Sequence, residues 1–144
     1  MEFFAIAEVA TSPEAIRERI TLPALPDFCE SFALIDALEG ESCEAETVWG
    51  RFRVDRQEIM GGLRFTMPGC PNCFAWTVTT GLPPCPDRIV IHGTINRPGH
   101  EDWFVESMEE FVAQWKAGLE ARLGGGAAPV PASPRPLPGL TIIR

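Results

Sequence analysis

The sequence predicts an α+β domain: an antiparallel four- to five-stranded sheet covered on one face by a long C-terminal amphipathic helix, with short helices after the first strand. Two observations carry this prediction. Several segments between residues 48 and 95 alternate apolar and polar side chains and are separated by short turns rich in Pro and Gly. The segment 101–123 instead repeats apolar side chains every three or four positions, as an amphipathic helix does.

The first strand is expected over residues 3–10, an apolar stretch of strand length. The segment Thr11-Ser12-Pro13-Glu14 then predicts a short helix, with either Thr11 or Ser12 as its N-cap. This helix should end before Pro23, because the residue that precedes a proline disfavours helical backbone.

Residues 27–40 allow two interpretations. As a helix, they begin with Asp27 as N-cap and end at Gly40, and one face carries Phe28, Phe32, Ile35 and Leu38. As a strand, alternate residues would line opposite faces of a buried segment. We favour the helix, because the signals at its two ends agree.

Four strands are expected next, over residues 48–54, 59–67, 74–79 and 88–95. Asp55-Arg56-Gln57 is interpreted as the turn between the first two, and Gly61-Gly62 as a bulge or a close backbone approach. Short turns between successive strands predict an antiparallel sheet with one dry face.

The last helix is expected to cover that dry face. Its apolar stripe consists of Phe104, Met108, Phe111, Trp115, Leu119 and Leu123. We therefore expect one domain over residues 1–123. Residues 124–144 are expected to form a flexible Gly/Pro-rich tail with an apolar tip, in which Leu140, Ile142 and Ile143 are candidate partner-binding residues.

Composition narrows the functional classes. A net charge of -8 disfavours nucleic acid and anionic membrane surfaces as partners, because both are bound through clustered Lys and Arg. The first residues contain acids and no basic stretch, so we expect no signal peptide and a cytoplasmic protein. Five cysteines without an export signal are expected to remain reduced thiols.

Cys70, Cys73 and Cys85 are the candidate metal ligands, since a C-x-x-C turn commonly supplies two zinc ligands. Cys85 is expected on a turn about one strand length away, which counts against a shared site. We therefore expect no cofactor, and zinc is kept as a possibility. A redox pair is a further interpretation, although the C-x-x-C leads into a strand and not into an activating helix.

A polar sheet face is the candidate ligand-binding surface. It is expected to carry His92, Thr77, Thr79, Thr94, Arg51, Arg53 and Arg64. Such a face could bind an anion or position a base, or could simply be solvated. No nucleophile or phosphate loop accompanies it, so no catalytic residue can be named.

These features favour a non-enzymatic accessory or protein-binding domain that acts through protein-protein contacts, and a homodimer is one candidate for such a contact. The tail supports this interpretation, as does the segment 27–46, in which seven acids occur without Lys or Arg. The order of expected elements also resembles the helix-grip domains of the START-like type, in which a curved sheet wraps a C-terminal helix around a ligand cavity, although the expected chain is about two strands short. That resemblance implies an alternative, a small apolar-ligand binding protein or enzyme. The third alternative is the Cys-based zinc or redox site.

Overall fold

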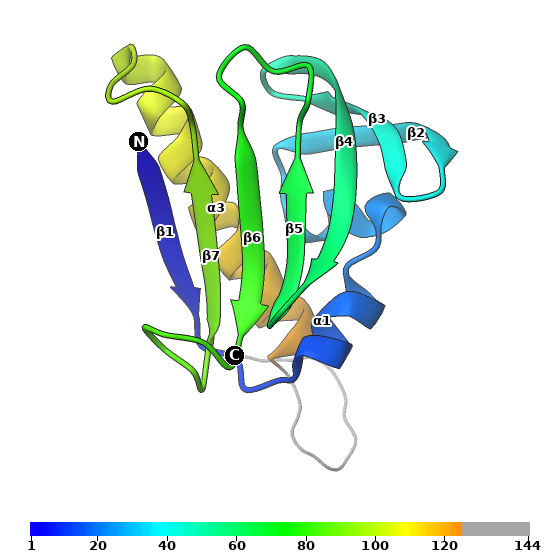
Figure 1. Ribbon diagram of the computed structural model, residues 1–144, viewed down its shortest axis with the longest axis vertical. Helices are drawn as coiled ribbons and strands as arrows, with labels where there is room; N and C mark the ends of the chain where they lie inside the picture. The colour runs from blue at the N-terminus through cyan, green and yellow to red at the C-terminus, as the bar shows by residue number, and fades with distance from the viewer. Residues whose placement is uncertain (125–144) are drawn as a thin grey trace.

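The computed structural model describes residues 1–124. One antiparallel sheet has the strand order β1-β7-β6-β5-β4-β3-β2, and α3 runs across one of its faces (Figure 1). The strands are β1 (Glu2–Ala7), β2 (Phe32–Glu39), β3 (Ser42–Thr47), β4 (Gly50–Ile59), β5 (Gly62–Thr66), β6 (Ala75–Thr80) and β7 (Ile89–Thr94). The helices are α1 (Pro13–Arg19), the short 3-10 helix η1 (Leu22–Ala24), α2 (Leu25–Phe28) and α3 (Asp102–Leu123).

The predicted α+β class, the antiparallel sheet and the C-terminal helix are confirmed, but the predicted number of strands was wrong. The sheet has seven strands, not four to five. The two strands that the sequence did not predict are β2 and β3.

The helix favoured for residues 27–40 was also wrong. Helix α2 ends at Phe28, because Cys29 already has extended backbone, and β2 then pairs with β3. Gly40, with φ at +60°, belongs to the tight turn between these strands and not to a helix end. Two register shifts in β2 and a positive φ at Ala37 break the strand alternation, which hid the strand in the sequence.

The β4–β5 hairpin turns later than expected. Asp55-Arg56-Gln57 lies inside β4, and the chain reverses at Met60-Gly61. Gly62 makes the close backbone approach, since a Cβ there would lie 2.2 Å from the carbonyl oxygen of Val78 on β6. The glycine pair therefore starts β5 against its neighbour and does not bulge an existing strand.

Helix α1 begins after Ser12, one of the two residues predicted as its N-cap. Ser12 is the N-cap, its Oγ accepts a hydrogen bond from the Ala15 amide, and Pro13 follows at the first helical position. Its C-terminal end is held by Arg56 of β4, whose side chain is 6% exposed and donates to the carbonyl oxygens of Arg17 and Ile20.

Aromatic side chains fill the centre of the space between the sheet and α3. The largest of the fully buried residues are Trp76, Trp115, Phe65 and Phe111. Phe65 stacks on Trp76 with ring centroids 5.1 Å apart, and Phe111 meets Trp76 edge-on at 5.0 Å. Gly118 lets α3 reach α2, because a Cβ there would lie 2.0 Å from the carbonyl oxygen of Phe28. Among residues 1–124, no helix is long and apolar enough to cross a membrane.

Candidate functional site

The outer face of the sheet, opposite α3, gathers part of the predicted polar set. Strand register places one row of side chains across five strands, from β1 to β4: Phe4, His92, Thr77, Arg64 and Gln57. Thr79 and Thr94 point the same way, two residues from Thr77 and His92 along their strands. The structure thus brings His92, the threonines and Arg64 onto one face, as alternation predicted.

His92 is already engaged at the β1 end of this row. Its ring stacks on Phe4 with centroids 4.3 Å apart and planes 5° from parallel. Its Nε2 atom lies 2.7 Å from Oε1 of Glu2. The imidazole is therefore bound by two β1 side chains.

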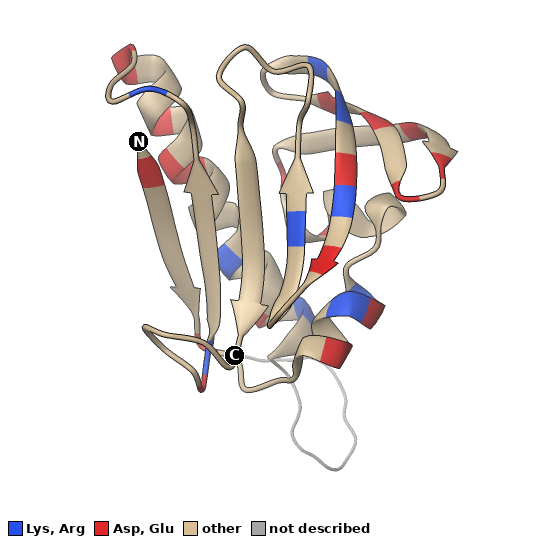
Figure 2. Ribbon diagram, viewed as in Figure 1, with Lys and Arg blue, Asp and Glu red and all other residues tan. Residues whose placement is uncertain are grey.

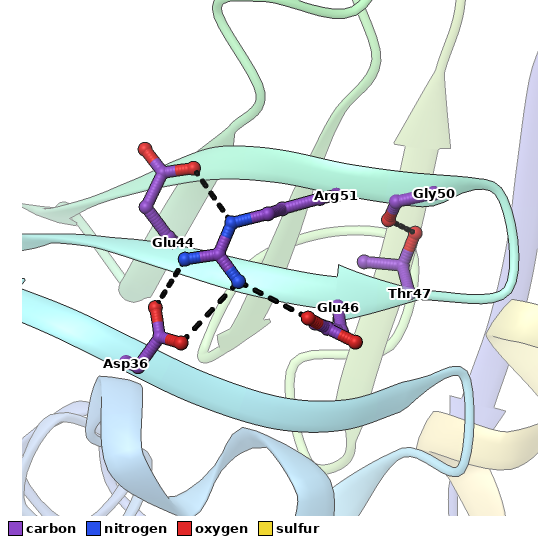
Figure 3. A network of polar contacts seen from close by, with 6 residues as sticks. All are labelled: Asp36, Glu44, Glu46, Thr47, Gly50 and Arg51. Carbon is purple, nitrogen blue, oxygen red and sulfur yellow. Dashed lines mark hydrogen bonds and ion pairs between the residues drawn. The ribbon is translucent and has the colours of Figure 1, made fainter.

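Arg51 and Arg53 lie apart from this row. Arg51 is six residues before Gln57 on β4, about 20 Å along the strand. It pairs with Asp36, Glu44 and Glu46 from β2 and β3 (Figure 3). These three carboxylates neutralise the positive charge of the guanidinium, and Arg51 is therefore poorly suited to bind an anionic ligand.

The acidic run 27–46 is partly neutralised in the same way. Arg56 on β4 binds Glu41, and Arg122 on α3 lies 4.0 Å from Asp27. The sequence did not predict these pairs, because the β2–β3 hairpin, which pairs with β4 through β3, was itself not predicted.

The predicted metal ligands are not assembled into one site. Cys70 and Cys73 lie on the β5–β6 connection, whereas Cys85 lies on the β6–β7 connection at the other end of β6. Within the described part of the chain, no group of three or more His, Cys, Asp or Glu side chains could hold a metal ion. The zinc alternative thus gains no support from the described residues.

Two further thiols are buried in the fold. Burial raises the pKa of Cys29 to about 12, despite hydrogen bonds with Ser31 that oppose the shift. Burial, with the nearby Glu44, raises the pKa of Cys43 to about 11. Both therefore stay protonated at neutral pH and act as packing groups.

A groove that sequence analysis did not find lies between β1 and α3. Its volume is about 320 Å³. Strand β1 lines it with residues 2–5, and α3 lines it with Glu109, Val112, Ala113 and Lys116. The groove exists because β1 lies at the edge of the sheet, where β7 is its only neighbour among residues 1–124.

The backbone of β1 is open toward this groove over part of its length. Met1 and Ile95 exchange main-chain hydrogen bonds, so antiparallel alternation turns the N–H and C=O groups of Glu2, Phe4 and Ile6 away from β7. Lys116 donates to the Ile6 carbonyl, and Glu120 accepts from the Glu8 amide. Side chains of α3 therefore hydrogen-bond to the main chain at the C-terminal end of β1, whereas the outward main-chain groups of Glu2 and Phe4 make no such bond to α3.

The open stretch is acidic. Glu2 and Glu109 flank it, and the one lysine that lines the groove, Lys116, already pairs with Glu120. Figure 2 shows acidic residues at the start of β1 and along the first half of α3. The groove thus offers backbone hydrogen-bonding groups, a small apolar floor at Val112 and Ala113, and negative charge.

The predicted partner-binding residues Leu140, Ile142 and Ile143 lie outside the described residues.

Comparisons with known proteins show the fold alone. No protein-family model and no curated protein matches the sequence. One similar solved structure is an uncharacterised protein from Bacillus thuringiensis, which is 12% identical to this chain with a TM-score of 0.54. The match covers 81% of this chain and 97% of that protein.

Proposed function

We propose that this domain is a non-enzymatic accessory protein that binds an extended segment of a partner protein along the free edge of β1. The observation that carries the proposal is the stretch at Glu2 and Phe4 beside the β1–α3 groove, whose outward main-chain groups pair with no other strand of residues 1–124. An extended peptide can add a strand to such an edge, where main-chain hydrogen bonds provide affinity and pockets for alternate side chains provide specificity.

The residues that line the groove support an expectation about the chemistry of the partner segment. A strand added beside β1 would direct alternate side chains toward Val112 and Ala113, which suits small or branched apolar residues. Glu2 and Glu109 favour a basic residue at the end nearer the start of β1. We therefore expect a segment that alternates apolar residues and carries at least one Lys or Arg.

The other edge of the sheet is a poorer template. Strand β2 contains two register shifts and the positive φ of Ala37, whereas β1 pairs with β7 in unbroken register. Bulges and twists of this kind are a common means of blunting an edge against pairing.

The helix-grip alternative, a carrier or enzyme for a small apolar ligand, gains less support. Its ligand would lie between the sheet and α3, where Trp76, Trp115 and Phe111 are packed at 0–1% exposure. A ligand there would need these rings to move apart, at the cost of their packing.

The direct test is selection of decapeptides from a random display library on the immobilised full-length protein. Selected peptides should alternate apolar residues, contain Lys or Arg, and protect the Glu2 and Phe4 amides from hydrogen exchange. The Phe4→Pro variant removes the edge N–H, while Phe4→Val keeps it in a strand-forming residue. Affinity should fall at least about tenfold in Phe4→Pro relative to Phe4→Val, about 1.4 kcal/mol.

A second matched pair of variants tests the contribution of negative charge in the groove. Glu109 lines the groove, whereas Glu110 is exposed on the same helix and does not line it. Glu109→Lys should weaken a selected basic peptide several-fold and Glu110→Lys should leave it nearly unchanged. Equal binding by both members of both pairs, or protection confined to β2, would reject the β1 site. Protection of Glu2 and Phe4 without added peptide would instead identify a second copy or another segment of this chain as the occupant.

A further inference from the structure

The loop that joins β5 to β6 holds two thiols at the ends of one tight turn. The amide of Cys73 donates a hydrogen bond of 3.0 Å to the carbonyl oxygen of Cys70, which is the pattern of a β-turn. A second bond of 3.0 Å, from the Cys70 amide to the Met67 carbonyl, holds the turn against the end of β5. We propose that Cys70 and Cys73 are a redox-active dithiol that closes reversibly to a disulfide by exchange with a low-molecular-weight disulfide.

The spacing fits this bond without rearrangement of the sheet. A β-turn brings the first and fourth Cα atoms within about 7 Å, and disulfides span Cα separations of about 4.4–6.8 Å. Cys73 has φ at +50°, a left-handed conformation that few residues other than glycine adopt. The turn is thus held in one defined shape with both thiols on it.

The two thiols differ in access, as attacking and resolving thiols do. Cys73 is exposed, and Nδ2 of Asn96 lies 3.5 Å from its sulfur, where it can donate a hydrogen bond to a thiolate. Cys70 is half-buried and packs against the core. The main-chain N–H of Asn96 also donates a hydrogen bond of 2.9 Å to the main-chain carbonyl oxygen of Asn72. This bond connects the turn to the segment that leads into α3.

The exchange balances with glutathione disulfide as the oxidant. The Cys73 thiolate attacks one sulfur of glutathione disulfide, the S–S bond breaks, and one glutathione thiolate leaves. Cys70, after losing its proton to solvent, attacks the Cys73 sulfur of the mixed disulfide and expels the second glutathione. The protein loses two protons and two electrons, and one glutathione disulfide becomes two glutathione thiols.

The other cysteines provide internal controls. Cys29 and Cys43 are 2% exposed, so a small disulfide cannot reach them in the folded protein. Cys85 lies on the β6–β7 connection, away from the Cys70–Cys73 turn, so it can form only a mixed disulfide.

The test is incubation of the reduced full-length protein with glutathione disulfide, followed by N-ethylmaleimide and peptide mass mapping. The peptide that contains residues 70–73 should lose two hydrogens, and dithiothreitol should restore both alkylation sites. In Cys70→Ser the glutathione adduct on Cys73 should persist, because the resolving thiol is gone. Asn96→Leu should slow the first step relative to the unchanged protein.

Two results would overturn the proposal. One is a stable glutathione adduct on Cys73 in the unchanged protein while Cys70 stays open to alkylation. The other is equal persistence of that adduct with and without Cys70. Circular dichroism before and after oxidation verifies that the reacting species is folded. Neither result bears on peptide binding at β1, so the two proposals can fail separately.

Discussion

The Nζ atom of Lys116 on α3 donates a hydrogen bond of 3.2 Å to the main-chain carbonyl oxygen of Ile6, on the edge of β1 that faces away from β7. Lys116 is the only lysine in the sequence. Together with Glu120, which accepts from the Glu8 amide, it occupies the end of the edge. The stretch of β1 whose outward main-chain groups lack these contacts is therefore short, because α3 supplies hydrogen-bonding side chains to Ile6 and Glu8.

Replacement of Lys116 should lengthen the open edge. In Lys116→Met the Ile6 carbonyl loses its donor, and edge-to-edge association should increase, because lysines on edges commonly oppose such pairing. The free energy of unfolding should change by only about 1 kcal/mol or less, since the contact is half-exposed. Sedimentation at equal concentrations measures the association, with Lys116→Arg as the control that keeps a donor. The same mass distribution in Lys116→Met and Lys116→Arg would contradict this role of the side chain.

Arg56 should be the most stabilising arginine of β4. Arg56→Met leaves the carbonyl oxygens of Arg17 and Ile20 without their donor at the end of α1, and should cost about 2 kcal/mol or more. Arg53→Met removes a solvent-exposed pair with Asp55 and should change the free energy of unfolding much less than Arg56→Met does. Urea denaturation of the two variants gives the comparison, and equal costs would be inconsistent with the bracing described.

Gly118→Ala should destabilise the protein although alanine is the better helix former. Its Cβ would lie 2.0 Å from the Phe28 carbonyl oxygen, so α2 and α3 must separate, at a cost of about 1–3 kcal/mol. The neighbouring Ala117 is exposed, and Ala117→Gly should cost about 1 kcal/mol from helix propensity alone. Thermal unfolding of both variants tests the contact. A higher melting temperature in Gly118→Ala would show that the helices do not meet there.

Glu120 should make stability depend on acidic pH. Partial burial alone would raise the pKa of its carboxyl group, but hydrogen bonds from the Glu8 amide and Lys116 outweigh it, so the pKa lies below its ordinary value of 4.5. A carboxylate with a lowered pKa in the folded state contributes stability above pH 4.5, and this stability is lost as the pH falls through the folded pKa. The unfolding free energy of Glu120→Gln should therefore fall less steeply than that of the unchanged protein below about pH 4.5. Parallel slopes in urea titrations across this range would exclude the contribution.

The elements whose apolar residues keep one regular spacing along the sequence were predictable. The stripe from Phe104 to Leu119 defined α3, and Ser12-Pro13 located the start of α1. Strand β2 was not predictable, because its two register shifts interrupt the alternation while Phe28, Phe32 and Ile35 happen to match a helical spacing. Strand β3 buries only Cys43 and Ala45, so its apolar signal is too weak to identify a strand.

The candidate site divides in the same way. Alternation within β6 and β7 was enough to place Thr77 and His92 on one face. The groove between β1 and α3 could not be predicted from the sequence, because its position depends on which strand lies at the edge of the sheet. Strand β1 lies there because it pairs with β7, across about 90 residues of sequence, and no local pattern encodes that choice.

The pairing of β1 with β7 also fixes the order in which the sheet can be completed during synthesis. Strand β1 is synthesised before the other strands of this sheet and must wait for its hydrogen-bonding partner until residue 94 has been added, whereas each of β3 to β6 can pair with the strand made just before it. After β7 has paired with β6 and until β1 joins it, β7 has an unpaired side, and the nascent domain carries an extra exposed edge. Closure by β1 is thus a late step that covers this side before α3 can reach its final contacts with both strands.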